Sequence, residues 1–157
     1  MSRKRRASQR KIEADTHYGY SVALSKFINM LMWDGKKSIA SRVVYDALDS
    51  VAKKRKDKPL VIFNKVITDL SPLVEVKSRR VGGATYSVPS EIRESRRIFL
   101  AMGWLINAAR KRGSGDMTKK LADEINDVLE ERGAAIKKKI DVHKAAESSR
   151  AFSHLRF

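Results

Sequence analysis

The sequence predicts a mainly α fold, a six-helix bundle with one protruding β-hairpin between helices three and four. Apolar residues recur at helical spacing in six segments of the 157-residue chain. Between the third and fourth segments, over residues 73–88, this pattern gives way to alternating apolar and polar residues with a pair of glycines. A hydrophobic content of 42% over this length suits one domain with a real core.

The first three helices are expected from their start and stop signals. The first begins near Tyr20 and ends before Asp34-Gly35. The second ends in the basic run 53–56, where cations suit the negative end of a helix dipole. The third begins at Pro59, which suits a first helical turn, and is stopped by Ser71-Pro72. Their apolar stripes contain Leu24, Phe27, Ile28, Leu31, Ile39, Val43, Val44, Ala47, Leu48, Val51, Leu60, Phe63, Ile67 and Leu70.

Residues 73–88 are expected to form the hairpin. Val74 and Val76 alternate with charged residues, and Gly82-Gly83 supplies a tight turn. Pro89 is expected to end the second strand, and Ser90 to cap the next helix. A two-stranded ribbon is only marginally stable in water, so the hairpin should lean on the helices or on a ligand.

Three further helices are expected after the hairpin. The fourth runs from about Glu91 to Arg112 and is stopped by residues 113–115. The fifth begins near Met117, and the sixth covers about 134–148. The domain organisation is then a disordered basic arm over 1–12 and a single helical domain over 13–157, with a basic tail over 149–157.

The charge balance predicts a polyanionic partner. Lys and Arg number 34 against 18 Asp and Glu, which gives a net charge of +16. Such an excess repels itself unless it is neutralised, and phosphate backbones are the usual partner. A membrane surface is the other candidate, but the sequence has no lipidation motif and no apolar run of about 20 residues. We therefore predict nucleic-acid binding and no membrane association.

The basic residues gather in clusters along the chain. Any single cluster is more often a solvated face, but five clusters with a large uncompensated total indicate a nucleic-acid surface. Aromatic residues near the clusters, Tyr86, Phe152 and Phe157, could stack on exposed bases. The cations that we expect to contact nucleic acid are Arg3, Lys4, Arg5, Arg6, Arg10, Lys11, Lys36, Lys37, Lys77, Arg79, Arg80, Arg96, Arg97, Arg110, Lys111 and Arg112.

Catalytic chemistry finds no support in the sequence. The chain has no cysteine, and its three histidines are not spaced as metal ligands. The segment Gly35-Lys36-Lys37-Ser38 resembles the end of a phosphate-binding loop, but Met30 stands where the first glycine belongs. No catalytic residue, metal site or cofactor is expected.

Two long motifs resemble one family. Residues 74–86 read Val-Glu-Val-Lys-Ser-Arg-Arg-Val-Gly-Gly-Ala-Thr-Tyr, and residues 141–154 include Asp-Val-His-Lys and Arg-Ala-Phe-Ser-His. Both are similar to signatures of bacterial-type small-subunit ribosomal protein seven. Shorter matches at 27–38, 42–45, 104–112 and 132–135 extend the resemblance over nearly the whole chain.

The resemblance implies a non-enzymatic RNA-organising protein. It implies primary binding to the 3′ major domain of 16S ribosomal RNA, which nucleates assembly of the subunit head. It further implies a place at the subunit interface near the decoding centre, where exit-site tRNA and mRNA pass. Ribosomal proteins nine and eleven of the same subunit are the implied protein partners. The expected location is a cytoplasmic ribosome, with an organellar ribosome as the open alternative.

The resemblance also implies which residues approach tRNA and mRNA. They lie at the hairpin tip, on the last helix and in the tail. These residues are Arg79, Val81, Gly82, Gly83, Ala84, Thr85, Lys138, His143, Arg150, His154 and Arg156.

Two rival functions remain at this point. A DNA-binding architectural protein would have a similar composition, but it would not carry the hairpin and tail motifs. An RNA-modifying enzyme would need a cofactor loop or a catalytic constellation. Binding to ribosomal RNA and to duplex DNA at equal salt distinguishes the first rival.

Overall fold

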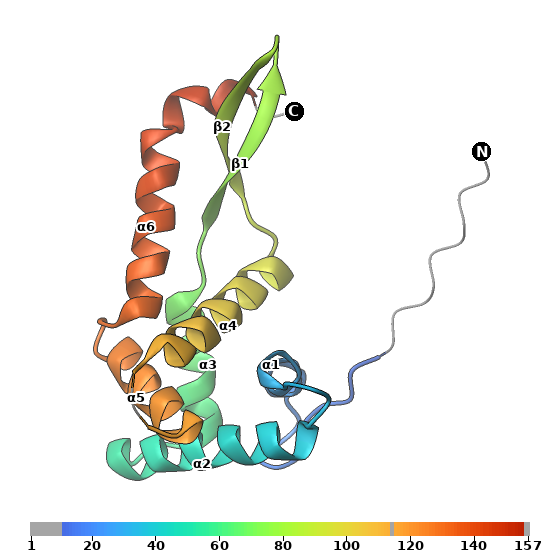
Figure 1. Ribbon diagram of the computed structural model, residues 1–157, viewed down its shortest axis with the longest axis vertical. Coiled ribbons are helices and arrows are strands. Elements are labelled where there is room, and N and C mark those ends of the chain that lie inside the picture. The colour runs from blue at the N-terminus through green and yellow to red at the C-terminus, as the bar shows by residue number, and fades with distance from the viewer. Residues whose placement is uncertain (1–10, 114, 156–157) are drawn as a thin grey trace, which may run out of the picture.

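A computed structural model of the chain describes residues 11–113 and 115–155. Within these residues, six α-helices and one antiparallel hairpin confirm the predicted fold class (Figure 1). The elements in order are α1 (Val22–Leu31), α2 (Lys37–Arg55), α3 (Pro59–Leu70), β1 (Val74–Val81), β2 (Ala84–Glu91), α4 (Glu94–Lys111), α5 (Met117–Leu129), α6 (Ala134–Ser148) and the 3-10 helix η1 (Arg150–Leu155).

The hydrophobic core lies among α1 to α5. Each of these helices buries one apolar stripe, and Phe27 of α1 meets Phe63 of α3 with ring centroids 5.4 Å apart. By contrast, α6 buries only Ala135 and Ala146. The sixth helix therefore extends from the core, and Figure 1 shows it rising beside the hairpin.

Helix starts follow local chemistry. The Ser21 hydroxyl accepts a hydrogen bond from the backbone N–H of Leu24 at 3.2 Å and so caps α1. Pro59 is the first residue of α3, as predicted. Asp116 precedes α5, and its carboxylate accepts from the N–H of Met117 at 2.8 Å.

The hairpin is longer than the sequence predicted. Its second strand continues through Pro89 and Ser90, so the prediction that Pro89 ends the strand and Ser90 caps α4 is wrong. A proline is tolerated because both strands of a two-stranded ribbon are edge strands, where a missing N–H need not break a ladder. In consequence α4 begins at Glu94 rather than near Glu91.

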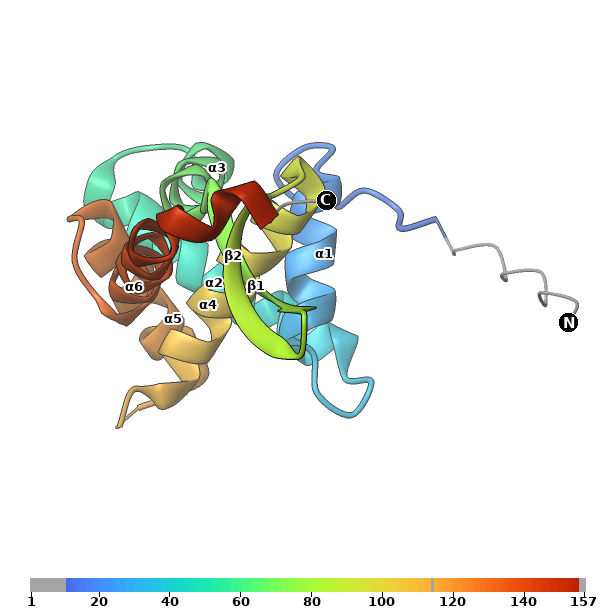
Figure 2. The ribbon, with the colours of Figure 1, turned by 90° about the horizontal axis from the view of Figure 1, so that it is seen from above.

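The hairpin has the expected glycine turn, and it packs against helices as expected. Gly82 and Gly83 have φ values of 58° and 89°, a left-handed conformation that favours glycine. The strands lean on α6 and on η1, which crosses the ribbon in Figure 2. Tyr86 of β2 and Phe152 of η1 contact with ring centroids 5.3 Å apart. The tail therefore folds back onto the hairpin.

Candidate nucleic-acid interface

The outer half of the hairpin carries exposed, unneutralised cations. Arg79 and Arg80 are exposed, and within the described part of the chain neither has a carboxylate partner. Nearer the helices, Glu75 lies 3.2 Å from the Lys77 ammonium and 3.7 Å from the Arg96 guanidinium of α4. The cations at the base of the ribbon are therefore paired with Glu75. Towards the tip, Arg79 and Arg80 have no carboxylate partner among the described residues.

A second basic group lies where the α1–α2 loop meets the end of α4. Lys36, Lys37 and Lys111 are exposed there. The Arg110 guanidinium donates to the Leu31 carbonyl at 3.1 Å, which holds the end of α4 against the end of α1. Two clusters far apart in the sequence therefore form one basic corner, which we call the loop corner.

A third group stands at the start of α4, between the hairpin and α1 (Figure 1). Arg97 is half-buried, and its Nε donates to the Ile92 carbonyl at 2.9 Å. Arg96 is exposed and lies 5.5 Å from the ring centroid of Phe99. Of this pair, Arg96 is the more exposed, although Glu75 lies 3.7 Å from its guanidinium.

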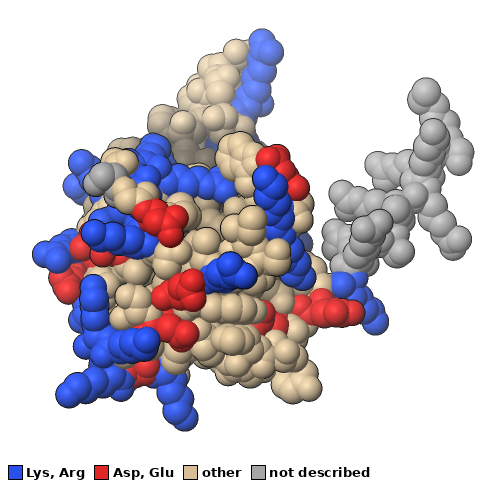
Figure 3. Space-filling view, turned by 60° about the horizontal axis from the view of Figure 1, so that its bottom comes forward, with Lys and Arg blue, Asp and Glu red and all other residues tan. Residues whose placement is uncertain are grey.

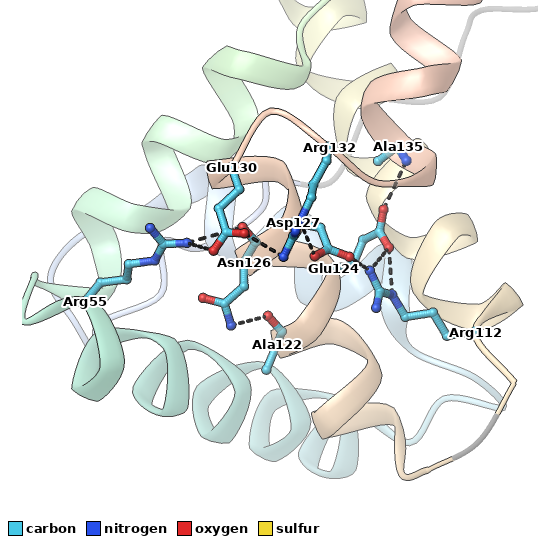
Figure 4. A network of polar contacts seen from close by, with 9 residues as sticks. All are labelled: Arg55, Arg112, Ala122, Glu124, Asn126, Asp127, Glu130, Arg132 and Ala135. Carbon is cyan, nitrogen blue, oxygen red and sulfur yellow. Dashed lines mark hydrogen bonds and ion pairs between the residues drawn. The ribbon is translucent and has the colours of Figure 1, made fainter.

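Arg112 lies in an internal ion-pair network, not on the surface of a basic cluster (Figure 4). Its Nε donates to Glu124 at 2.7 Å, and its Nη2 also pairs with Asp127. Glu124 is 1% exposed, and its other oxygen accepts from the N–H of Ala135 at 3.0 Å. Gly133 has a φ of 100°, and a Cβ there would meet Asp127 at 3.0 Å. The network therefore fastens α4 to α5 and to the start of α6.

The carboxylates of this network shift the pKa of the Arg112 guanidinium. Burial alone would lower the pKa of Arg112, but the hydrogen bonds and charges of Asp127 and Glu124 outweigh burial and raise it. Because two carboxylates already neutralise this guanidinium, we expect Arg112 to contribute less to RNA binding than the cations that have no carboxylate partner. The outer part of the network, where Arg55 and Arg132 both pair with Glu130, is more exposed.

Polar residues of α6 and η1 make contacts within the protein, and one of these contacts reaches the start of the hairpin. The His143 Nε2 accepts a hydrogen bond from the N–H of Leu73 at 3.2 Å, just before β1. Lys139 donates to the Asp69 carbonyl at 2.6 Å, near the end of α3. His154 Nδ1 lies 3.0 Å from the Ala151 carbonyl within η1. Lys138 and Arg150, in contrast, are exposed.

Figure 3 brings the lower side of the molecule forward. Basic side chains gather at the hairpin end and at the opposite edge, while acidic side chains are scattered over the face between them. Within the described residues no helix is long and apolar enough to cross a membrane, and no group of three potential metal ligands occurs.

A family model described as ribosomal protein S7p/S5e matches residues 2–150. The chain belongs to this family. Curated relatives named small ribosomal subunit protein uS7 are 54% identical in Marinobacter nauticus and Azotobacter vinelandii and 53% identical in Methylococcus capsulatus. Each match spans 157 residues and 100% of both chains. As an S7p/S5e protein, the chain is a structural ribosomal protein and not an enzyme.

Several predicted site residues of this S7p/S5e protein lie outside the described residues. They belong to the N-terminal arm and the last residues of the chain. These are Arg3, Lys4, Arg5, Arg6, Arg10 and Arg156. Lys11, the first described residue, is exposed, as are Val81, Gly82, Gly83, Ala84 and Thr85 at the hairpin tip.

An aromatic cluster that was not predicted from the sequence docks residues 11–21 on α2. The His17 ring stacks on Tyr45 with centroids 4.0 Å apart, and the Tyr45 hydroxyl donates to Asp15 at 2.5 Å. The Tyr18 hydroxyl donates to Asp49 at 2.6 Å. Burial and the hydrogen bond to Asp15 raise the pKa of Tyr45 to about 12. No spacing rule links positions about 30 residues apart, so only the fold reveals this cluster.

Proposed function

We propose that this chain is a primary RNA-binding protein of the small ribosomal subunit, which binds the 3′ major domain of 16S ribosomal RNA and nucleates assembly of the head. The observation that supports this most is the set of exposed cations at the hairpin and the loop corner. Arg79 and Arg80 are exposed on the hairpin, and Lys36 and Lys37 are exposed at the loop corner of the helical body. Cations spaced in this way can neutralise phosphates of two RNA helices and select their relative arrangement.

The hairpin is proposed to approach exit-site tRNA and mRNA. Its tip is slender, because Gly82 and Gly83 carry no side chain, and Arg79 and Arg80 lie beside it. Strands of eight residues can reach on the order of 25 Å at about 3.3 Å per residue. Family resemblance further suggests ribosomal proteins nine and eleven as neighbours.

Two matched pairs of lysines on one helix test the RNA proposal. Lys36 and Lys37 flank the start of α2, whereas Lys53 and Lys54 lie near its end, about 25 Å away by helical rise. Figure 1 shows these two ends on opposite sides of the molecule. Affinity for the 3′ major domain RNA is measured over a range of salt concentrations for K36A/K37A and K53A/K54A.

K36A/K37A should weaken binding and reduce the slope of log K against log salt by about 2, since each lost phosphate contact removes about one released counterion. K53A/K54A should leave the slope nearly unchanged. Equal slopes for both variants would contradict the proposed interface. Equal affinity of the unaltered chain for duplex DNA and for this RNA would favour the architectural DNA-binding rival.

A further inference from the structure

Trp33 is a large aromatic residue left on the surface of the loop corner. It is 67% exposed, in the turn that joins α1 to α2. The other tryptophan, Trp104, is half-buried in α4. An exposed indole forgoes the burial that ordinarily stabilises this side chain, and tryptophan is the side chain best suited to stacking and cation–π contacts.

The ring is held in place from one side. The Arg110 guanidinium lies 5.4 Å from the ring centroid of Trp33. The same guanidinium donates to the Leu31 carbonyl at 3.1 Å, so it is fixed to the end of α1. Arg110 thus covers one face of the indole, and the large exposed area of Trp33 leaves the other face to solvent.

The surroundings of the ring favour a negatively charged partner. Lys36, Lys37 and Lys111 are exposed in the loop corner, and the described α1–α2 loop contains one acidic residue, Asp34. A flat aromatic face beside several cations matches the two parts of a nucleotide, a planar base and a phosphate. An apolar protein surface would match the ring but would leave these cations without a counter-charge.

We propose that Trp33 stacks on an unpaired nucleobase of ribosomal RNA, while Lys36 and Lys37 neutralise the adjacent phosphates. This inference rests on the proposed RNA-binding function and adds a base-stacking site to it. Arg110 acts as a positioning residue, because it orients the indole before the base arrives.

The test compares W33F, W33L and W33A in binding to the 3′ major domain RNA. Base–aromatic stacking is typically worth a factor of roughly 5 to 100 in affinity. W33L and W33A should weaken binding within this range, and W33F should retain most of the affinity because it keeps a ring. W33L should leave the salt slope unchanged, whereas K36A should reduce it by about 1.

Tyr20 supplies the matched control. It is 90% exposed, and within the described residues no arginine lies over its ring. Y20L should bind RNA as the unaltered chain does. Thermal melting of all variants verifies that affinity is compared between folded proteins.

A second readout reports on the ring itself. In a W104F background, Trp33 is the sole tryptophan, and its fluorescence should be quenched when RNA binds because of stacking on a base. Unchanged affinity in W33L, or W33F binding as weakly as W33L, overturns the stacking site while leaving RNA binding intact. No binding of this RNA by the unaltered chain overturns the proposed function itself, and the stacking site with it.

Discussion

Arg112 and Arg132 approach the same acidic cluster, but water reaches them to different extents. The Arg112 side chain is 29% exposed and pairs with Glu124, which is almost fully buried. The Arg132 side chain is 68% exposed and pairs with Asp127 at 3.2 Å. A buried charge that loses its partner is costly, whereas an exposed pair contributes little.

Arg112→Ala should therefore lower the free energy of unfolding by about 2–4 kcal/mol, because Glu124 would remain buried without its counter-charge. Arg132→Ala, the matched control, should cost less than about 1 kcal/mol. Urea denaturation measures both changes. RNA affinity of folded Arg112→Ala should be nearly unchanged; a large loss of affinity in a stable variant would place Arg112 in the interface.

The exposure of some site residues could be predicted from the sequence, but the partners of others could not. Basic clusters are visible in the sequence, and Arg79, Arg80, Lys36 and Lys37 are indeed exposed. Arg110 and Arg112 belong to the same basic run of the sequence, but the partners of Arg112 are carboxylates of the next helix. Likewise, the contact between Trp33 and Arg110 joins positions that only the packing of α1 on α4 brings together.

The stability of the hairpin depends on its contact with η1. Phe152 packs against Tyr86, and the hydrophobic core does not include either ring. Phe152→Ala should free the hairpin locally and speed hydrogen exchange of its amides roughly fivefold, which corresponds to about 1 kcal/mol for an aromatic pair. The melting temperature of the helical core should stay nearly constant.

Ile39→Ala is the control for this experiment, because Ile39 is also an exposed apolar residue but lies on α2, which does not contact the hairpin within the described residues. It should leave hairpin exchange unchanged. A fall of the core melting temperature in Phe152→Ala as large as the local effect would mean that hairpin and core unfold together.

The docking of segment 11–21 on α2 depends on the protonation state of the Tyr45 hydroxyl. The folded state raises the pKa of Tyr45 to about 12 from its ordinary value near 10, since the hydroxyl is buried and donates to Asp15. Its contribution to stability is therefore complete below about pH 10 and is lost as pH rises towards 12. Unfolding free energies measured from pH 8 to 12 should fall more steeply for the unaltered chain than for Tyr45→Phe. Parallel curves would contradict the role of this hydroxyl.

Helices were predicted more accurately than the hairpin for a physical reason. A helix reveals itself through its buried stripe, and α3, which buries such a stripe, begins at the predicted Pro59 and ends just before the predicted stop at Ser71. A two-stranded ribbon buries little, so its ends depend on neighbours rather than on its own pattern. The sequence therefore indicated where the hairpin lies but could not show that β2 continues through Pro89 to Glu91.

For the whole molecule, charge at the N-terminus should act on binding and not on folding. Residues 2–10 contain five cations and little apolar surface. Ile12, in contrast, lines a groove with Met30 and Phe99, so we would retain it. Deleting 2–10 should reduce the salt slope by up to about 4 or 5 and leave the melting temperature unchanged.

Replacing the five cations of this segment by glutamine preserves chain length and supplies the control. It should reproduce the loss of slope if charge alone is responsible. A deletion that lowers the melting temperature, while the glutamine variant does not, would instead show that the segment packs on the fold.

The dependence of the hairpin on α6 and η1 has a consequence for the nascent chain. Synthesis proceeds from the N-terminus, so β1 and β2 emerge well before His143 and Phe152, which hold them in the finished protein. During that interval the ribbon has two open edges, the kind of surface that pairs with other unfinished chains. Arg79 and Arg80 are already on the strand at that stage, and their mutual repulsion between copies would keep such edges apart. The charges that we propose to bind RNA would thus first protect the protein during its own synthesis.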